Sequence, residues 1–157
     1  MSKFFNFFLV SFLALIFFPS FVFAAGEFGL SQNITYQFDQ NGNTQVSQEV
    51  TLENKLANIY ATQYKITISG GAVQNIKAIE DNQELRVETK ESQRNLTEVT
   101  VFFDQPAAGL GKKRQFSLQY LLPEYAKREG QTWRVLIPKI SNLEELEELT
   151  INISTPQ

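Results

Sequence analysis

The sequence predicts an all-β fold, and two observations lead to this prediction. Apolar and polar residues alternate with a period of two through most of the chain after residue 25, a pattern typical of strands with one buried and one solvated face. Turn-forming Gly, Asn and Pro residues separate these runs at short intervals. Together they favour an immunoglobulin-like or fibronectin-like antiparallel β-sandwich of about eight or nine strands, preceded by an N-terminal hydrophobic signal helix.

The first two strands are expected on either side of an Asn41-Gly42 turn. NITYQFD alternates before the turn and QVSQEVTLE alternates after it. Because Asn and Gly tolerate positive φ, the two runs are predicted to pair as a hairpin. The same stretch, DQNGN, resembles the start of a calcium loop, but Thr44 and Val50 stand where that loop needs Gly and Glu. We therefore expect a turn here and no metal site.

Seven further runs alternate in the same way: IYATQYKITI, VQNIKAIE, ELRVET, LTEVTVFF, QFSLQYLL, TWRVLIP and LTINIS. Two short helices are expected between strands. LPEYAKREG (122–130) has Pro123 at a first helical position and Gly130 as a stop, and SNLEELEEL (141–149) has an N-cap followed by acids. No linker or repeat interrupts residues 25–157, which are predicted to form a single domain.

Residues 1–24 have the layout of a secretory signal peptide. One early cation, Lys3, precedes an apolar stretch, and Pro19 and Ser20 then interrupt it before two small residues. We predict cleavage between Ala24 and Ala25 and a location outside the cytoplasm, in the medium or at the cell surface. The alternative is an uncleaved anchor, because the apolar segment is just long enough to span a bilayer. The protein is then membrane-attached, as it also is if a C-terminal anchor is missing from this sequence.

The charge and composition of the exported part exclude several classes of function. It holds thirteen of the fourteen bases and all seventeen acids, a net charge of −4, which argues against a nucleic-acid partner. The chain has no Cys and no His, so thiol and Ser-His catalysis and ordinary zinc sites are excluded. We expect no catalytic residue, metal or cofactor. A carboxylate enzyme stays as a remote alternative, which requires two acids converging in a pocket with raised pKa values.

One basic cluster is a candidate contact site. GLGKKR follows a predicted strand, but it lacks the first Gly and the final Ser or Thr of a phosphate-binding loop. It is interpreted as a charged loop tip. Lys112, Lys113 and Arg114 are nevertheless predicted to make weak contacts with anionic polymers of the cell envelope.

The aromatic residues admit two interpretations, a sugar-binding platform or a share of the core. Most of them stand in register with Ile, Val or Leu on their own predicted strand, which favours the core. This set comprises Tyr36, Tyr60, Tyr64, Tyr120 and Trp133. Tyr125 is the exception.

A signal peptide followed by ITYQFDQNGNTQVSQEVTLEN, YATQYKITI, GLGKKRQFSLQY and GQTWRVLIPKI resembles the N-terminal region of exported bacterial transglutaminase-like proteins. The resemblance implies a β-sandwich placed before a papain-like domain that uses Cys, His and Asp. Because this chain has neither Cys nor His, no catalytic residue carries over.

The resemblance therefore implies a non-catalytic accessory domain in contact with a catalytic domain beyond Gln157. The alternative is a free-standing cell-surface module that binds glycan or peptide. Membrane contact is expected only through the signal segment or a C-terminal anchor.

Overall fold

The computed structural model describes residues 26–70, 72–92, 95–138 and 146–155, and every regular element within these ranges is a β-strand. The prediction of an all-β chain is therefore confirmed for the described residues. The strands are β1 (Phe28–Phe38), β2 (Thr44–Asn54), β3 (Gln63–Ser69), β4 (Gln74–Glu80), β5 (Gln83–Leu85), β6 (Val87–Ser92), β7 (Leu96–Phe102), β8 (Lys113–Leu122), β9 (Ala126–Glu129), β10 (Thr132–Val135) and β11 (Leu146–Ser154).

The predicted signal segment 1–24 and the Ala24–Ala25 junction lie outside the described residues. Within the part of the chain that is described, no helix is long and apolar enough to cross a membrane. Export therefore stays a prediction from the sequence.

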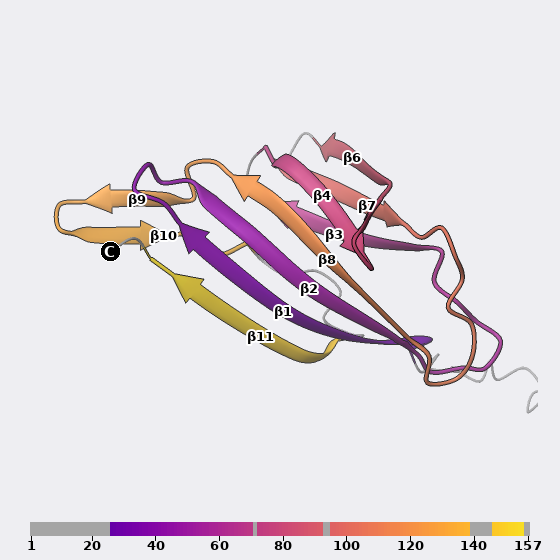
Figure 1. Cartoon of the computed structure of the whole chain (residues 1–157). Coiled ribbons are helices and arrows are strands. Elements are labelled where there is room, and N and C mark those ends of the chain that lie inside the picture. Colours follow the sequence, from indigo (N-terminus) through magenta and orange to yellow (C-terminus); the bar gives the residue numbers. More distant parts are fainter. Residues whose placement is uncertain (1–25, 71, 93–94, 139–145, 156–157) are drawn as a thin grey trace, which may run out of the picture.

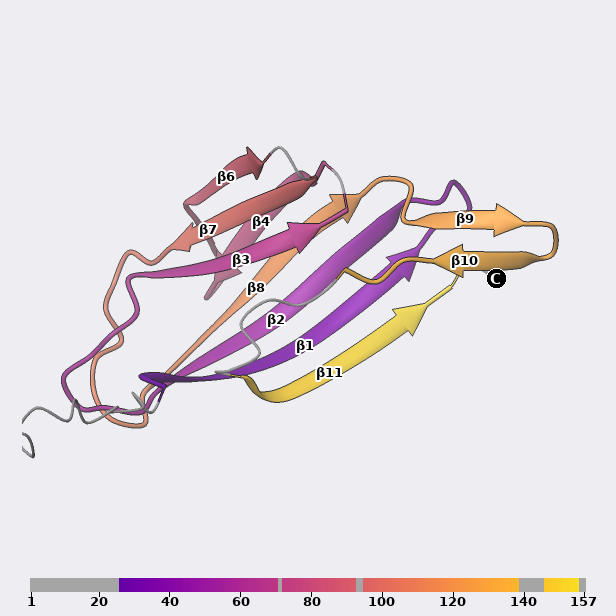
Figure 2. The same ribbon diagram turned by 180° about the vertical axis from the view of Figure 1, so that it is seen from behind.

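The strands form two sheets and a separate hairpin (Figures 1 and 2). The larger sheet has the order β11-β1-β2-β8-β4-β5, the smaller has the order β3-β7-β6, and β9 pairs with β10. β11 runs parallel to β1, with Ile151 beside Ile34 and Ile153 beside Tyr36. The prediction of a wholly antiparallel sandwich is wrong at this edge. Most of the chain separates the two strands, so no tight turn forces them to run in opposite directions.

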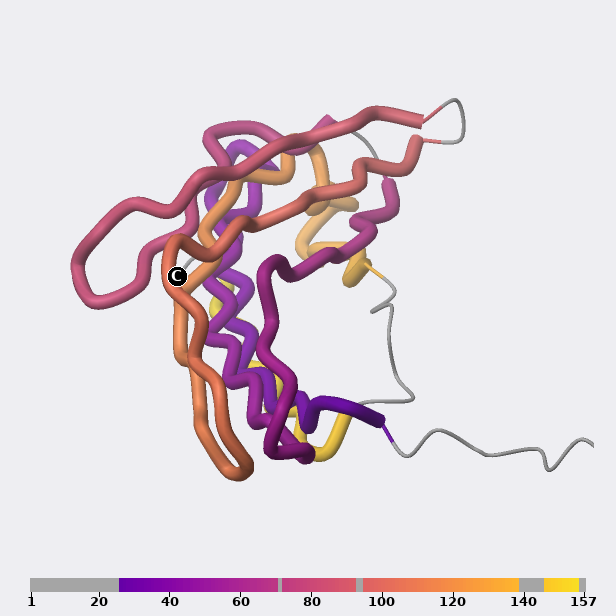
Figure 3. The backbone as a smooth tube through the Cα atoms, turned by 90° about the vertical axis from the view of Figure 1, so that its right-hand side faces the viewer, coloured from indigo at the N-terminus to yellow at the C-terminus, as the bar shows by residue number. Residues whose placement is uncertain are grey.

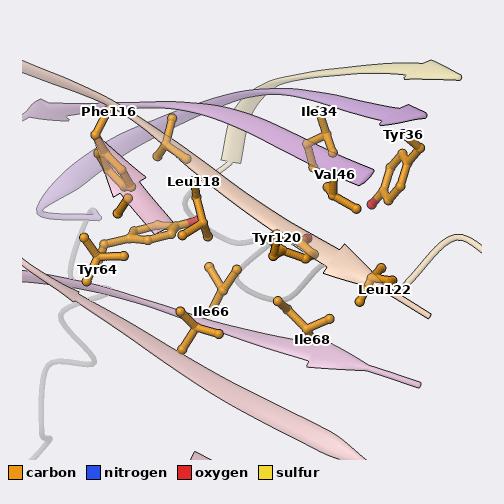
Figure 4. Close-up of a cluster of buried hydrophobic side chains, with 14 of the residues drawn as sticks. Ile34, Tyr36, Val46, Tyr64, Ile66, Ile68, Phe116, Leu118, Tyr120 and Leu122 are labelled. Carbon is orange, nitrogen blue, oxygen red and sulfur yellow. The ribbon is translucent and has the colours of Figure 1, made fainter. Parts of the chain in front are cut away.

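The core lies between the two sheets and consists of alternate side chains from facing strands (Figure 4). On β8, Phe116, Leu118 and Tyr120 are all buried. The ring of Tyr64 on β3 meets that of Phe116 edge to face, with centroids 5.3 Å apart, and so joins the smaller sheet to the larger one. The alternation predicted for these strands is confirmed.

The chain changes sheets at Arg86, within the run ELRVET that was predicted as one strand. β5 before this residue pairs in the larger sheet, and β6 after it pairs in the smaller sheet. The Arg86 carbonyl accepts a hydrogen bond from the Phe102 backbone at 2.9 Å, and its guanidinium lies 3.8 Å from the Phe102 ring centroid. This crossing divides one of the nine expected strands into two, and β9, which lies in a segment predicted as a helix, brings the described strands to eleven.

The helix predicted for residues 122–130 is wrong, because this segment contains the end of β8 and all of β9. Glu124 has a φ of 61°, outside the helical region, and redirects the chain. Tyr125 is then buried, contrary to the prediction, and its hydroxyl donates to the Ser69 carbonyl at the end of β3. Burial of this ring outweighs the weak stability of a two-turn helix.

The second predicted helix, residues 141–149, is wrong for its described part. Residues 146–149 belong to β11, and 141–145 lie outside the described residues. The β-branched Thr150, Ile151 and Ile153 favour a strand, and pairing with β1 satisfies its backbone.

The Asn41-Gly42 turn is confirmed, and Asp39 holds it together. The Asn43 side chain, at 3.1 Å, and the backbone N–H groups of Asn41 and Asn43, each at 2.8 Å, donate to the Asp39 carboxylate and hold its pKa below the usual range. Gly42 has a φ of 86°, and a Cβ there would collide with the Ala126 carbonyl. The oxygen atoms that suggested a calcium loop therefore organise a turn.

The smaller sheet has three strands and the larger sheet six, so part of the larger sheet has no strand of the described residues opposite it (Figure 3). The result is seen on β11. Its apolar residues Leu149, Ile151 and Ile153 share the face of Ile34 and Tyr36, yet they are 37%, 40% and 50% exposed. The last run, LTINIS, is a strand as predicted, but its apolar face is not buried.

Leu118→Ala should lower the free energy of unfolding by roughly 2 to 5 kcal/mol, because the side chain is fully buried and its loss leaves a cavity. Urea unfolding followed by the fluorescence of Trp133, the single tryptophan, measures the change. Leu110→Ala is the control, since Leu110 is 68% exposed and should cost less than about 0.5 kcal/mol. Equal losses in the two variants would contradict the described core.

Candidate functional site: a polar cavity beside tied loops

A polar cavity of about 720 Å³ lies between the β4–β5 hairpin and the loop of residues 103–112 that joins β7 to β8. Its lining includes three carboxylates, those of Glu80, Asp81 and Asp104, together with Arg114. Asp81 and Asn82 have φ values of 49° and 63°, as a two-residue hairpin turn of positive-φ residues requires. The turn between β4 and β5 thereby brings Glu80 and Asp81 to the cavity.

Arg114 is the central side chain of the cavity wall and is 7% exposed. Its guanidinium donates to a Glu80 carboxylate oxygen at 2.7 Å and to the backbone carbonyl of Gln105. It also lies 4.2 Å from the centroid of the Phe103 ring. These contacts fasten the β7–β8 loop to the β4–β5 hairpin.

The carboxyl of Glu80 has a raised pKa. Burial is the largest cause, and Asp81 and Asp104 act in the same direction, whereas the positive charge of Arg114 opposes them. The net shift is upward even though the ion pair is short. Removal from water therefore outweighs the attraction of Arg114 at this site.

The predicted basic cluster does not form one surface. Lys112 and Lys113 are exposed, and Lys113 pairs with Glu53 at 3.3 Å. Arg114 points the other way and is buried against Glu80. The sequence contains a signal for this division, because Arg114 stands in register with Phe116 on the same strand. The lysines alone stay as candidates for contact with an anionic polymer.

Asn54, which no sequence pattern indicated, ties two loops together at the same end of the sandwich. Its buried side-chain amide donates to the Ile59 carbonyl at 3.0 Å and to the Ala107 carbonyl at 2.6 Å. Its backbone N–H bonds the Lys112 carbonyl at 2.9 Å, and its carbonyl accepts from Gly111 at 2.8 Å. One side chain thus fixes the loop 55–62 against the loop 103–112.

The cavity meets only part of the requirement for acid–base chemistry. A hydrolytic pair needs one carboxyl free to donate a proton and a second to act as base or nucleophile. Glu80 has a raised pKa and neighbouring acids, but its carboxylate is bound to Arg114. Among the described residues, no group of three or more acidic, His or Cys side chains is placed to hold a metal ion. The arrangement is that of a structural ion pair in a polar wall.

The aromatic side chains do not form a platform. Tyr36, Tyr64 and Tyr120 are buried, as predicted, and Trp133 is half-buried beside the core. Burial raises the pKa of Tyr36 to about 12, with Tyr125 as a second cause. Tyr60 was expected in the core but is 49% exposed, because β3 begins only at Gln63. It lines a second cavity of about 300 Å³ with Phe28, Leu30 and Leu52.

No protein-family model and no curated protein matches the chain. Among solved structures, an M1 zinc metallopeptidase from Deinococcus radiodurans is similar at a TM-score of 0.39 and 18% identity, over 65% of this chain and 22% of the peptidase. A non-cellulosomal cohesin from Archaeoglobus fulgidus is similar at a TM-score of 0.36 and 11% identity, over 81% of this chain and 92% of the cohesin. The chain thus spans about a fifth of the peptidase, and neither likeness is close enough to assign a function.

Glu80→Gln should change the free energy of unfolding at neutral pH by less than about 1 kcal/mol, because burial already favours the uncharged form of this side chain and the amide oxygen can still accept a hydrogen bond from Arg114. Glu84→Gln, the same change at an exposed neighbour, should cost less than about 0.5 kcal/mol. Urea unfolding of both variants measures the difference.

The pH dependence gives a second readout. Since the folded-state pKa of Glu80 is raised, its protonation favours the folded state. That part of the stability is present below the unfolded-state pKa and is lost as pH rises through the folded one. Glu80→Gln should remove this decline and Glu84→Gln should keep it. An unchanged pH profile in Glu80→Gln would contradict the assignment.

Proposed function

We propose that the chain is a non-catalytic β-sandwich module of an exported protein, of immunoglobulin-like or fibronectin-like type, and that it acts through contact with another protein domain. The proposal rests on the exposed apolar side chains of the loop end, which we define as residues 55–62 and 103–112. Leu56, Tyr60 and Leu110 on these loops are 49%, 49% and 68% exposed.

The loop end has the properties expected of a contact surface. Its two loops leave the same end of the sandwich (Figure 1), and Asn54 bonds to both of them. Exposed apolar side chains on loops held by a rigid scaffold are typical of protein contact sites. A surface that is already ordered loses little conformational entropy when a partner binds.

The partner proposed is a transglutaminase-like domain of the same polypeptide, which the sequence resemblance implies. Such a domain carries its own Cys, His and Asp, so this module needs no reactive side chain. Its contribution is to position the catalytic domain outside the cytoplasm. The coding sequence beyond Gln157 tests this directly: a Cys- and His-bearing domain is expected, and a stop codon at that point would refute the proposal.

Leu110→Ser combined with Tyr60→Ser should weaken the contact in the longer polypeptide, because both changes remove exposed apolar surface from the loop end. The two domains, which are expected to unfold in one calorimetric transition, should then unfold in two. Leu136→Ser is the control, since Leu136 is 57% exposed but lies on neither loop. A single unfolding transition in the double variant, or two transitions in the control as well, would count against the loop end as the contact surface.

A free-standing binding module is the second candidate, and the polar cavity favours it. The cavity offers the carboxylates of Asp81 and Asp104 and the amide of Gln105, groups that bind hydroxyl or ammonium groups of a glycan or peptide. Titration with soluble cell-wall glycans and peptides, followed by NMR shifts at Gln105 and its neighbours, tests this role. Shifts absent at millimolar ligand would dismiss it.

A further inference from the structure

β11 leaves one edge of the larger sheet open. It is the outermost strand beside β1, and no described strand lies on its other side (Figures 1 and 2). Open edges are commonly protected by shortness, Lys, Pro or a covering segment. The outer strand β5 has three residues, and β6 carries Glu88, Lys90 and Glu91. β11 has nine residues and contains no Lys, Arg or Pro, and its two acids, Glu147 and Glu148, stand near its N-terminal end, so the stretch from Leu149 to Ser154 carries no charge.

The two faces of β11 differ sharply in polarity. Leu149, Ile151 and Ile153 lie on the same face as Gln32, Ile34 and Tyr36 of β1 and remain 37% to 50% exposed. The opposite face is polar, and there the Asn152 amide donates to the Asn33 side chain at 2.8 Å. β11 is therefore fixed in register with β1 while its apolar side chains and its outer backbone edge stay accessible.

We propose that this edge pairs with the same edge of a second copy of the chain. The two β11 strands run antiparallel about a two-fold axis at Ile151 and join two six-stranded sheets into one. A two-fold axis perpendicular to the sheet keeps the apolar faces of both copies on the same side. Such an isologous contact is the commonest kind in protein dimers.

The sequence of β11 is self-complementary in this register. Ile151 lies opposite Ile151 of the second copy, and Leu149 lies opposite Ile153 of the second copy on both sides of the axis. Cross-strand apolar pairs of this kind are the unit by which antiparallel sheets are stabilised. All three exposed apolar side chains thereby gain an apolar neighbour.

The charges select the same register. Glu147 and Glu148 lie opposite Thr155 and Ser154 of the second copy, so no acid faces an acid. A shift of the axis to Thr150 puts Glu147 opposite Ile153, and a shift to Glu148 puts two carboxylates face to face. The chain has a net charge of −3, and the register centred on Ile151 keeps the carboxylates of the two copies apart, which favours this pairing over the other two.

Thiol cross-linking tests the pairing and its register, because the chain has no Cys of its own. The full chain, purified after export, is prepared as Ile151→Cys and as Ser154→Cys and treated with a short bis-maleimide. Ile151→Cys should give a covalent dimer, since the two thiols meet at the axis. Ser154→Cys should give at least tenfold less, since its two thiols are six residues apart along the strands. Equal yields, or none from Ile151→Cys, would overturn the proposal.

Sedimentation of the untreated proteins gives an independent measure. The wild type should sediment as a dimer, and Ile151→Lys should raise its dissociation constant at least tenfold by placing two ammonium groups together at the axis. Thr150→Lys, an equal charge on the polar face, should leave the dimer in place. A monomeric wild type at the cross-linking concentration would refute the pairing. Because the loop end is a different surface, these results do not depend on the proposed accessory role.

Discussion

Burial of apolar side chains between two sheets of unequal size is the constraint on which the rest of this structure depends. The chain has no Cys and therefore no disulfide to restrain its unfolded state. Stability has to come from side chains such as Leu118 and Val99, which are fully buried between the sheets. The unequal size of the sheets then decides which apolar residues reach this interior and which stay at its margin.

Polar groups near the margin of the core hold the loops in place. Arg114 and Asn54 are both nearly buried, and each bonds to backbone carbonyls of the 103–112 loop. Burying such groups is costly unless their hydrogen bonds are made, so their contacts restrict where the loops can lie. The same bonds that stabilise this end of the sandwich therefore present Leu56, Tyr60 and Leu110 in a fixed arrangement.

The sequence predicted the elements better than it predicted their surroundings. Alternation is a local property, so it identified β1, β2 and β8 and their buried faces correctly. The same alternation places Arg114, two residues before Phe116, on the buried face of β8. The run of three cations nevertheless suggested a single exposed patch. The partner of Arg114 was not predictable, since Glu80 is 34 residues away and is brought there by sheet pairing. The sheet change at Arg86 and the parallel pairing of β11 are likewise decided by tertiary packing, which no local pattern reports.

The runs QFSLQY and LTINIS show how the same local pattern can lie in different surroundings, and what that means for function. Both runs alternate in the same way, yet Phe116 is 2% exposed and Ile151 is 40% exposed, because the smaller sheet lies opposite β8 whereas no described strand lies opposite β11. We propose that an apolar pattern at a position that no described strand covers reflects contact with another surface. For β11 the self-complementary register makes a second copy the simplest source. For the loop end, whose apolar residues follow no such symmetry, a different domain is the natural partner. The two surfaces therefore predict two contacts that differ in kind, and a variant of one should leave the other intact.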